Sequence, residues 1–151
     1  MNKEIRHVWF FPQSAETIWE YLTDSELLSQ WLMKNDFKPV VGHKFSFKSS
    51  PAPAIEFDGN VYCEVLEISA PEKVSYSWRF GPAPGETVID SRVVWMLTPK
   101  NGGTELLLVH SGFTDLRQVP AYEAMNKGWQ MNINKIHGLI ATKEKNEATS
   151  H

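Results

Sequence analysis

The side chains with the most chemical potential in this chain are its histidines and its one cysteine, and their spacing favours no metal site. The histidines are His7, His43, His110, His137 and His151. No two of them have the H-x-H or H-x-x-x-H spacing that brings two imidazoles to one ion. Because the chain has one cysteine and no carboxylate-rich loop, the sequence predicts neither a metal nor another cofactor, and it excludes an internal disulfide.

A catalytic nucleophile is not predicted either. His110 and Ser111 are adjacent and lie near Asp115, but neighbouring residues of a strand point to opposite faces and form no dyad there. The serine also lacks the G-x-S-x-G turn that exposes a nucleophile. Cys63 lies among apolar residues of a predicted strand, which indicates a buried, unreactive thiol. We therefore assign no catalytic residue, and whether the protein is an enzyme stays open.

The aromatic residues carry more information. Eight Phe, six Trp and four Tyr make up 12% of the 151 residues, a load that must fill a core or line a pocket. In segment 73–80, apolar and aromatic residues alternate with polar ones, which is typical of a half-buried strand with an aromatic inner face. In segment 103–112, His110 shares its face with two leucines.

A glycine in a predicted helix suggests where the pocket lies. Gly128 occupies a mid-helix position, where glycine costs about 1 kcal/mol relative to alanine. Such a residue fits a place where the backbone approaches something closely or where space is left empty. Large rings with a few polar groups are typical of the wall of a ligand pocket. The predicted ligand-binding residues are Trp78, Trp95, His110, Phe113, Met125, Gly128, Trp129 and Asn132.

The elements that must position these residues define an α+β fold. Strands are predicted at 4–11, 43–49, 59–69, 73–80, 86–98 and 103–112. A short helix follows the N-cap candidate Ser14, and a capping box over 23–26 opens a second one. The apolar stripe of a long helix over 120–142 is Tyr122, Met125, Trp129, Ile133, Ile136 and Ile140.

Short turns between the strands predict a curved antiparallel sheet of about six strands. We expect the sheet to wrap around the long C-terminal helix, with two short helices between the first two strands. Trp19 and Trp31, on the apolar faces of those helices, are expected to be structural plugs. Residues 1–143 form one predicted domain, and the polar segment 144–151 is expected to be a disordered tail.

Composition excludes two classes of partner. The net charge of −3 lacks the basic excess of a nucleic-acid-binding surface. The longest apolar runs are strand-sized, too short for a membrane span or the core of a signal peptide. We therefore expect a cytoplasmic location.

The order of several local strings resembles the helix-grip superfamily, which comprises the START-like and Bet v 1-like domains. Within it, the chain is most similar to the family of activator-of-Hsp90-ATPase homologue 1-like proteins. The strings that carry the resemblance are Pro12 to Trp19 with Asp24, Leu27 and Trp31; Gly42 to Phe47; Gly59 to Glu67 with Pro71, Glu72, Val74 and Trp78; Gly103 to Leu106 with His110, Gly112 and Phe113; and Gly128-Trp129.

The resemblance implies a helix-grip fold with a cavity between the sheet and the C-terminal helix. Sister families use this cavity to carry lipids or sterols, to bind phenolic compounds or to cyclise polyketides. It therefore implies binding of a hydrophobic small molecule: aromatic, lipid or polyketide-like.

Two alternatives stay open. The first is a cyclase or hydrolase that uses the same cavity, with His110 as its proton-transfer group. The second is a protein-interaction module of the Hsp90-activator type, with a chaperone or a second copy of the chain as its partner.

Overall fold

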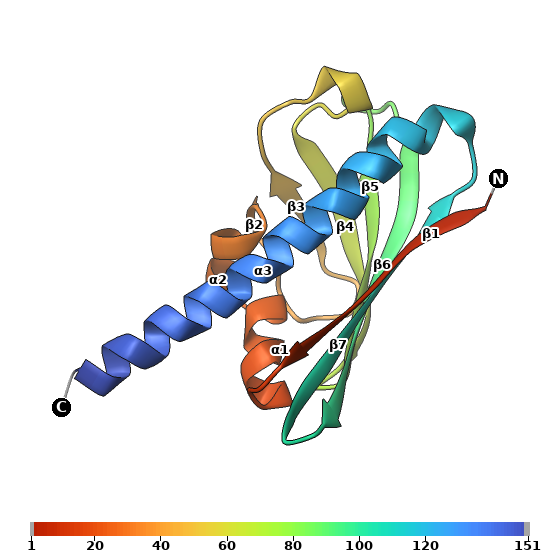
Figure 1. The fold of residues 1–151 in the computed structure, drawn as a ribbon. Helices are drawn as coiled ribbons and strands as arrows, with labels where there is room; N and C mark the ends of the chain where they lie inside the picture. Colours follow the sequence, from red (N-terminus) through yellow and green to blue (C-terminus); the bar gives the residue numbers. More distant parts are fainter. Residues whose placement is uncertain (1, 150–151) are drawn as a thin grey trace.

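The computed structural model describes residues 2–149, in which a seven-stranded antiparallel sheet curves around one long helix (Figure 1). The elements are β1 (Lys3–Phe11), α1 (Ala15–Thr23), α2 (Ser25–Trp31), β2 (Lys34–Asn35), β3 (Lys44–Lys48), η1 (Pro53–Ile55), β4 (Asn60–Ser69), β5 (Lys73–Phe80), β6 (Ile89–Lys100), β7 (Gly103–Phe113), η2 (Leu116–Gln118) and α3 (Val119–Thr149). The predicted α+β helix-grip architecture is confirmed.

The sheet is an open meander of β2 to β7, and β1 is added at its edge beside β7. Its order is β1-β7-β6-β5-β4-β3-β2, so β1 and β2 form opposite edges. The helices α1 and α2 connect those edges and cover one end of the sheet (Figure 1). The seventh strand, β2, has two residues, which is too short to leave a periodic pattern in the sequence.

Both short helices begin at the predicted places, with one change of cap. The Ser14 hydroxyl accepts from the backbone N–H of Thr17 at the start of α1. The second helix is capped by Asp24, whose carboxylate accepts from the N–H groups of Glu26 and Leu27. Thr23, which the predicted capping box used as the cap, instead donates its hydroxyl to the backbone oxygen of Trp19. A carboxylate accepting two N–H groups replaces the expected box.

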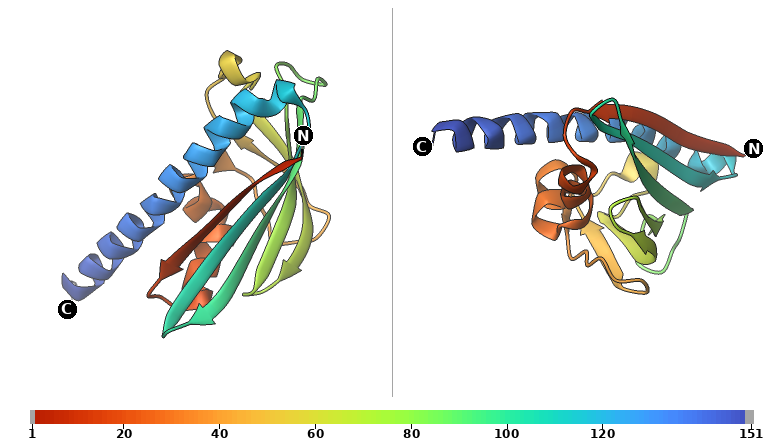
Figure 2. Two further views of the ribbon diagram at one scale, coloured as in Figure 1. Left: turned by 45° about the vertical axis from the view of Figure 1, so that its right-hand side comes forward. Right: turned by 90° about the horizontal axis from the view of Figure 1, so that it is seen from below.

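Helix α3 crosses the concave side of the sheet, and its C-terminal part extends beyond the short helices (Figure 2). Four residues of its predicted stripe are buried, whereas Tyr122 and Met125, near its N-terminal end, are half-buried. The other side of the helix faces solvent, as the exposed Met131 shows. The apolar stripe is therefore more completely buried against the sheet from Trp129 onward than in the first turns of the helix.

Residues 144–149, which are predicted from the sequence to lie in a polar tail, belong to the long helix, which extends past its predicted end at 142. Helix α3 continues to Thr149, and the side chain of Gln13 donates a hydrogen bond to Glu144 at 3.4 Å. Adding residues to an existing helix avoids the cost of nucleation, and this segment contains the good helix formers Lys, Glu and Ala. Residues 150–151 lie outside the described residues.

The inner faces of the strands form one aromatic core. On β5 the residues Val74, Tyr76, Trp78 and Phe80 are at most 3% exposed, as the alternation predicted. Leu106, Leu108 and His110 on β7 are fully buried on one face.

Trp31, the last residue of α2, packs against the inner face of the sheet at the end that the short helices cover. It is fully buried, packs edge-on against Trp95, and donates its indole N–H to the backbone oxygen of Tyr21 at 2.7 Å. Trp19 is only half-buried against the same core. Of the two predicted plugs, Trp31 therefore has the larger structural role.

We expect Trp31→Ala to lower the free energy of unfolding by about 3–5 kcal/mol, because it leaves a large cavity and an unpaired carbonyl. Trp19→Ala is the matched control and should cost clearly less. Urea unfolding followed by circular dichroism measures both. Equal losses for the two variants would contradict the assignment of Trp31 as the plug.

Candidate functional site

A partly open pocket of about 160 Å³ lies between α3, the strands β4 and β5, and the loops at one end of the sheet. Twelve residues line it: Leu32, Met33, Ile55, Phe57, Val61, Trp78, Phe80, Ala124, Met125, Gly128, Trp129 and Asn132. None of these twelve side chains is charged. The pocket is therefore an apolar site with one amide and two indoles as its polar groups.

The helical wall of the pocket follows from the spacing along α3. Ala124, Gly128 and Asn132 are four residues apart, with Met125 and Trp129 beside them, so all five share one face of the helix. A Cβ atom built on Gly128 would meet no atom within 4 Å. The small residues at 124 and 128, which lie beside the apolar stripe, leave a gap next to its larger side chains.

The opposite wall is aromatic. The rings of Trp78 and Trp129 lie 5.2 Å apart between centroids, so they join the strand wall to the helix wall. Phe57 and Phe80 pack edge-on at 5.1 Å on the loop side. The aromatic rings of this wall therefore pack against one another, and this packing keeps the wall from moving into the pocket.

Directly behind this wall, His110 takes part in a linear chain of hydrogen bonds from α3 to the sheet. The indole N–H of Trp129 donates to His110 Nδ1 at 3.1 Å, so the proton of the neutral ring resides on Nε2. His110 Nε2 lies 2.8 Å from Ser91 Oγ, to which it donates. The Ser91 hydroxyl in turn donates to the backbone oxygen of Trp78 at 2.8 Å. Both ring nitrogens of His110 therefore have partners within the protein.

Burial lowers the pKa of His110 to about 3, because a charged imidazole in this dry environment loses its hydration. The side chain is fully buried and does not line the pocket. Its geometry suits it to positioning Trp129. The alternative in which His110 transfers a proton to or from a ligand gains no support from this arrangement.

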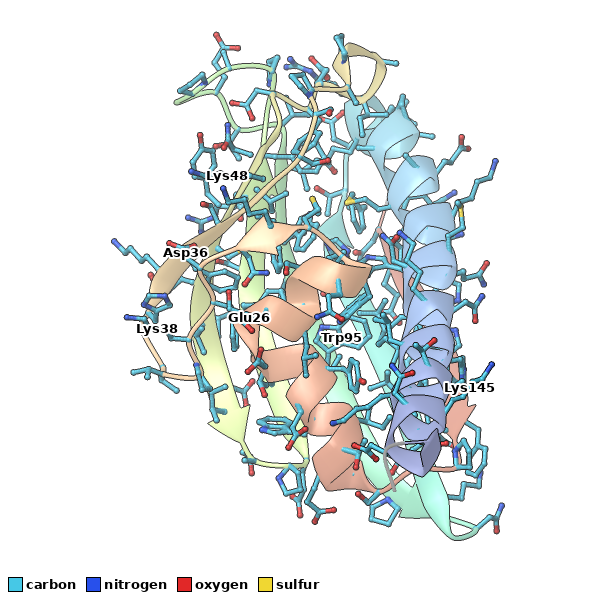
Figure 3. All side chains as sticks on the ribbon, turned by 90° about the vertical axis from the view of Figure 1, so that its left-hand side faces the viewer. Glu26, Asp36, Lys38, Lys48, Trp95 and Lys145 are labelled. Carbon is cyan, nitrogen blue, oxygen red and sulfur yellow. The ribbon has the colours of Figure 1, made fainter. Side chains whose placement is uncertain are left out.

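Five of the eight predicted site residues line the pocket: Trp78, Met125, Gly128, Trp129 and Asn132. The other three are in the surrounding core. Trp95 lies in the interior between the short helices and α3 (Figure 3), with its indole N–H donated to the hydroxyl of Tyr76. Phe113 packs against His110, 5.0 Å between ring centroids, and like His110 it is fully buried. The alternation of residues along the strands correctly predicts that these three side chains point into the protein. It does not show that they are buried behind the pocket wall.

The residues predicted from the sequence did not include Val61, Phe80 and Ala124, which lie on predicted strands and the long helix, nor the lining residues that come from connecting segments. Leu32 and Met33 follow α2, while Ile55 and Phe57 belong to the loop around η1. These segments have no periodicity that marks an inner face. A weak signal was present in the apolar residues of the otherwise polar loop 49–59.

The loop around η1 is held against the start of α3 by an ion pair. Glu56 accepts three hydrogen bonds from the Arg117 guanidinium, one from Nη2 at 2.6 Å and two from Nε at 2.9 and 3.2 Å. This hydrogen bonding lowers the pKa of Glu56. Glu56 lies between the lining residues Ile55 and Phe57, so the ion pair fixes one rim of the pocket.

The described part of the chain offers no support for a metal site or a reactive thiol. Among residues 2–149, no three His, Cys, Asp or Glu residues gather closely enough to hold a metal ion. Cys63 is buried, and burial raises the pKa of its thiol well above the usual value. Within the same range, no helix combines the length and apolar character that crossing a membrane requires.

Comparison with known proteins identifies the family. The profile described as Activator of Hsp90 ATPase homolog 1-like protein matches residues 12–141, and the chain belongs to this family. No curated protein shows a significant match.

Solved structures share the fold of this chain. Protein MLL2253 from Mesorhizobium loti is 32% identical, with a TM-score of 0.81 over 93% of this chain and 98% of that one. Protein BH1534 from Bacillus halodurans is 26% identical, with a TM-score of 0.67 over 88% and 94% of the two chains. The Aha1 dimer from Colwellia psychrerythraea is 18% identical, with a TM-score of 0.71 over 89% and 92%.

The buried state of His110 predicts how stability changes with pH. The unfolded chain binds a proton at this residue below pH of about 6.5, whereas the folded protein binds it only near pH 3. The free energy of unfolding should therefore fall as the pH is lowered between these values, by up to about 1.4 kcal/mol per pH unit from this residue. Urea unfolding of the parent and His110→Gln between pH 4 and 6 should show a shallower slope in the variant. An NMR titration that gave His110 a midpoint near 6.5 would contradict the buried, hydrogen-bonded ring.

Proposed function

We propose that the protein binds a small, uncharged, ring-containing hydrophobic molecule in the pocket between α3 and the sheet. The observation that carries the proposal is the lining: twelve uncharged residues, mostly apolar or aromatic, around an open space beside Gly128. Pockets that bind small molecules typically combine such apolar walls with a few polar groups.

The size of the pocket narrows the ligand class that we propose. An engineered apolar cavity of about 150 Å³ binds benzene. A pocket of about 160 Å³ that is open on one side therefore suits a core of one or two rings. This favours an aromatic ligand over the lipid and larger polyketide-like alternatives, whose volume would require the walls to move.

The lining also disfavours charged ligands. The charged residues Glu56 and Arg117 lie on the rim of the pocket. Their charges already neutralise each other and are not available to a ligand. A carboxylate or an ammonium inside the pocket would lose its hydration without gaining a partner, which is costly. No titratable side chain among the twelve is available for acid or base catalysis, so our proposal is binding without a chemical step.

The test uses Gly128→Leu. If the space beside Gly128 is a pocket, the leucine side chain enters it, helix propensity improves by roughly 1 kcal/mol, and the melting temperature holds or rises. Binding of one- and two-ring aromatic compounds should be lost. Thermal melts and NMR titrations of the indole N–H signals of Trp78 and Trp129 measure both effects.

Gly138→Leu is the matched control. Gly138 is on the same helix, is exposed, and also has open space around its Cβ, but it lies outside the pocket. This variant should gain the same helix propensity and keep its ligand affinity. A destabilised Gly128→Leu, together with a parent protein that binds no aromatic compound, would contradict the proposal and favour the protein-interaction alternative.

A further inference from the structure

One side chain in the pocket wall has unused hydrogen-bonding capacity. Asn132 is the only lining residue with an aliphatic polar side chain, and its amide makes no hydrogen bond to the rest of residues 2–149. An amide offers two donors and one acceptor. In a wall that is otherwise apolar, such a group is well placed to orient a ligand.

The helix geometry directs this amide toward the open part of the pocket. Side chains of an α-helix tilt toward its N-terminus, so Asn132 leans over the turn that contains Gly128. Because Gly128 has no side chain and a Cβ there would contact nothing within 4 Å, this space is free. The amide of Asn132 thus borders the volume that the proposed ligand occupies.

The other polar atoms of the wall are less available. The indole N–H of Trp129 is already donated to His110. The indole N–H of Trp78 has no partner among the described residues, but the atom is itself covered by neighbouring groups. A ligand would reach it only after a shift of the wall, whereas Asn132 is half-buried and accessible.

From this arrangement we infer that Asn132 is the specificity-determining residue of the site and that it selects neutral aromatic compounds carrying a hydroxyl or carbonyl group. The inference rests on the proposed function and deepens it. The aromatic part of the ligand packs between Trp78, Trp129 and Met125. Its oxygen meets the Asn132 amide as donor, acceptor or both. A hydrocarbon of the same shape leaves the amide unpaired, and a carboxylate brings a charge that no lining residue neutralises.

The test uses three probes of one shape: 2-naphthol, 2-methylnaphthalene and 2-naphthoate. A hydrogen bond with a net contribution in the usual range should make 2-naphthol bind about two- to tenfold more tightly than 2-methylnaphthalene. The affinity for 2-naphthoate should be at least about tenfold weaker than for 2-naphthol. NMR titration of the protein gives the three dissociation constants.

Variants then assign the preference to one residue. Asn132→Leu should bind 2-methylnaphthalene at least as well as the parent and lose the preference for 2-naphthol. Asn134→Leu, which changes an exposed residue on the same helix, should keep the preference. Trp78→Phe removes the other unpaired N–H; it also changes the wall and should weaken binding of all the probes, but the ratio of the affinities for 2-naphthol and 2-methylnaphthalene should stay.

The possible failures are distinguishable. If none of the three probes binds the parent, the proposed function is wrong. If 2-naphthol and 2-methylnaphthalene bind equally well, or if the preference survives Asn132→Leu, the pocket stands but the role of Asn132 is overturned. Loss of the preference in Trp78→Phe alone would move the role to the indole, and tightest binding of 2-naphthoate would overturn the selection of neutral ligands.

Discussion

The position of α3 on the sheet depends on the buried hydrogen bonds that join Trp129 to His110, His110 to Ser91, and Ser91 to the backbone of Trp78. This chain crosses from the helix through β7 and β6 to β5, so it fixes the helix relative to three strands at once. Every donor and acceptor in it has a partner, which is the condition under which a buried polar network is stabilising. Removing one member leaves another unpaired, at a cost of about 1–3 kcal/mol.

With the helix held at this point, its interface with the sheet divides into a filled part and a hollow part. Toward the C-terminus, Ile133, Ile136 and Ile140 fill the space against the core. Toward the N-terminus, Ala124 and Gly128 are too small to do so, and the pocket opens there. The rings of Trp78 and Trp129 stand at the boundary. A hollow of this kind is retained because its rigid aromatic walls cannot relax into it.

Much of this could be predicted from the sequence, because strand alternation and helix periodicity report directly on which face is buried. From these patterns we predict that Trp78, Gly128, Trp129 and Asn132 face one pocket, and all four line it. Strand and helix periodicity does not show how deep a residue lies: Trp95 and Phe113 face inward but are buried behind the pocket. It also gives no information on loops, and Ile55 and Phe57 reach the pocket from a loop. It left an acid or base role for His110 open, because spacing along the chain does not reveal that both ring nitrogens have partners.

The ion pair between Glu56 and Arg117 gives the rim of the pocket a different sensitivity to salt from its interior. It joins the loop that carries Ile55 and Phe57 to the segment that leads into α3, and the Arg117 side chain is 62% exposed. Dissolved ions screen exposed charges over about 10 Å at 0.1 M ionic strength, and they compete with such a pair. The uncharged interior of the pocket is insensitive to them. If the pocket binds the ligand proposed above, the rim that this pair joins is the part of the site most exposed to dissolved ions, whereas the lining that contacts the ligand carries no charge.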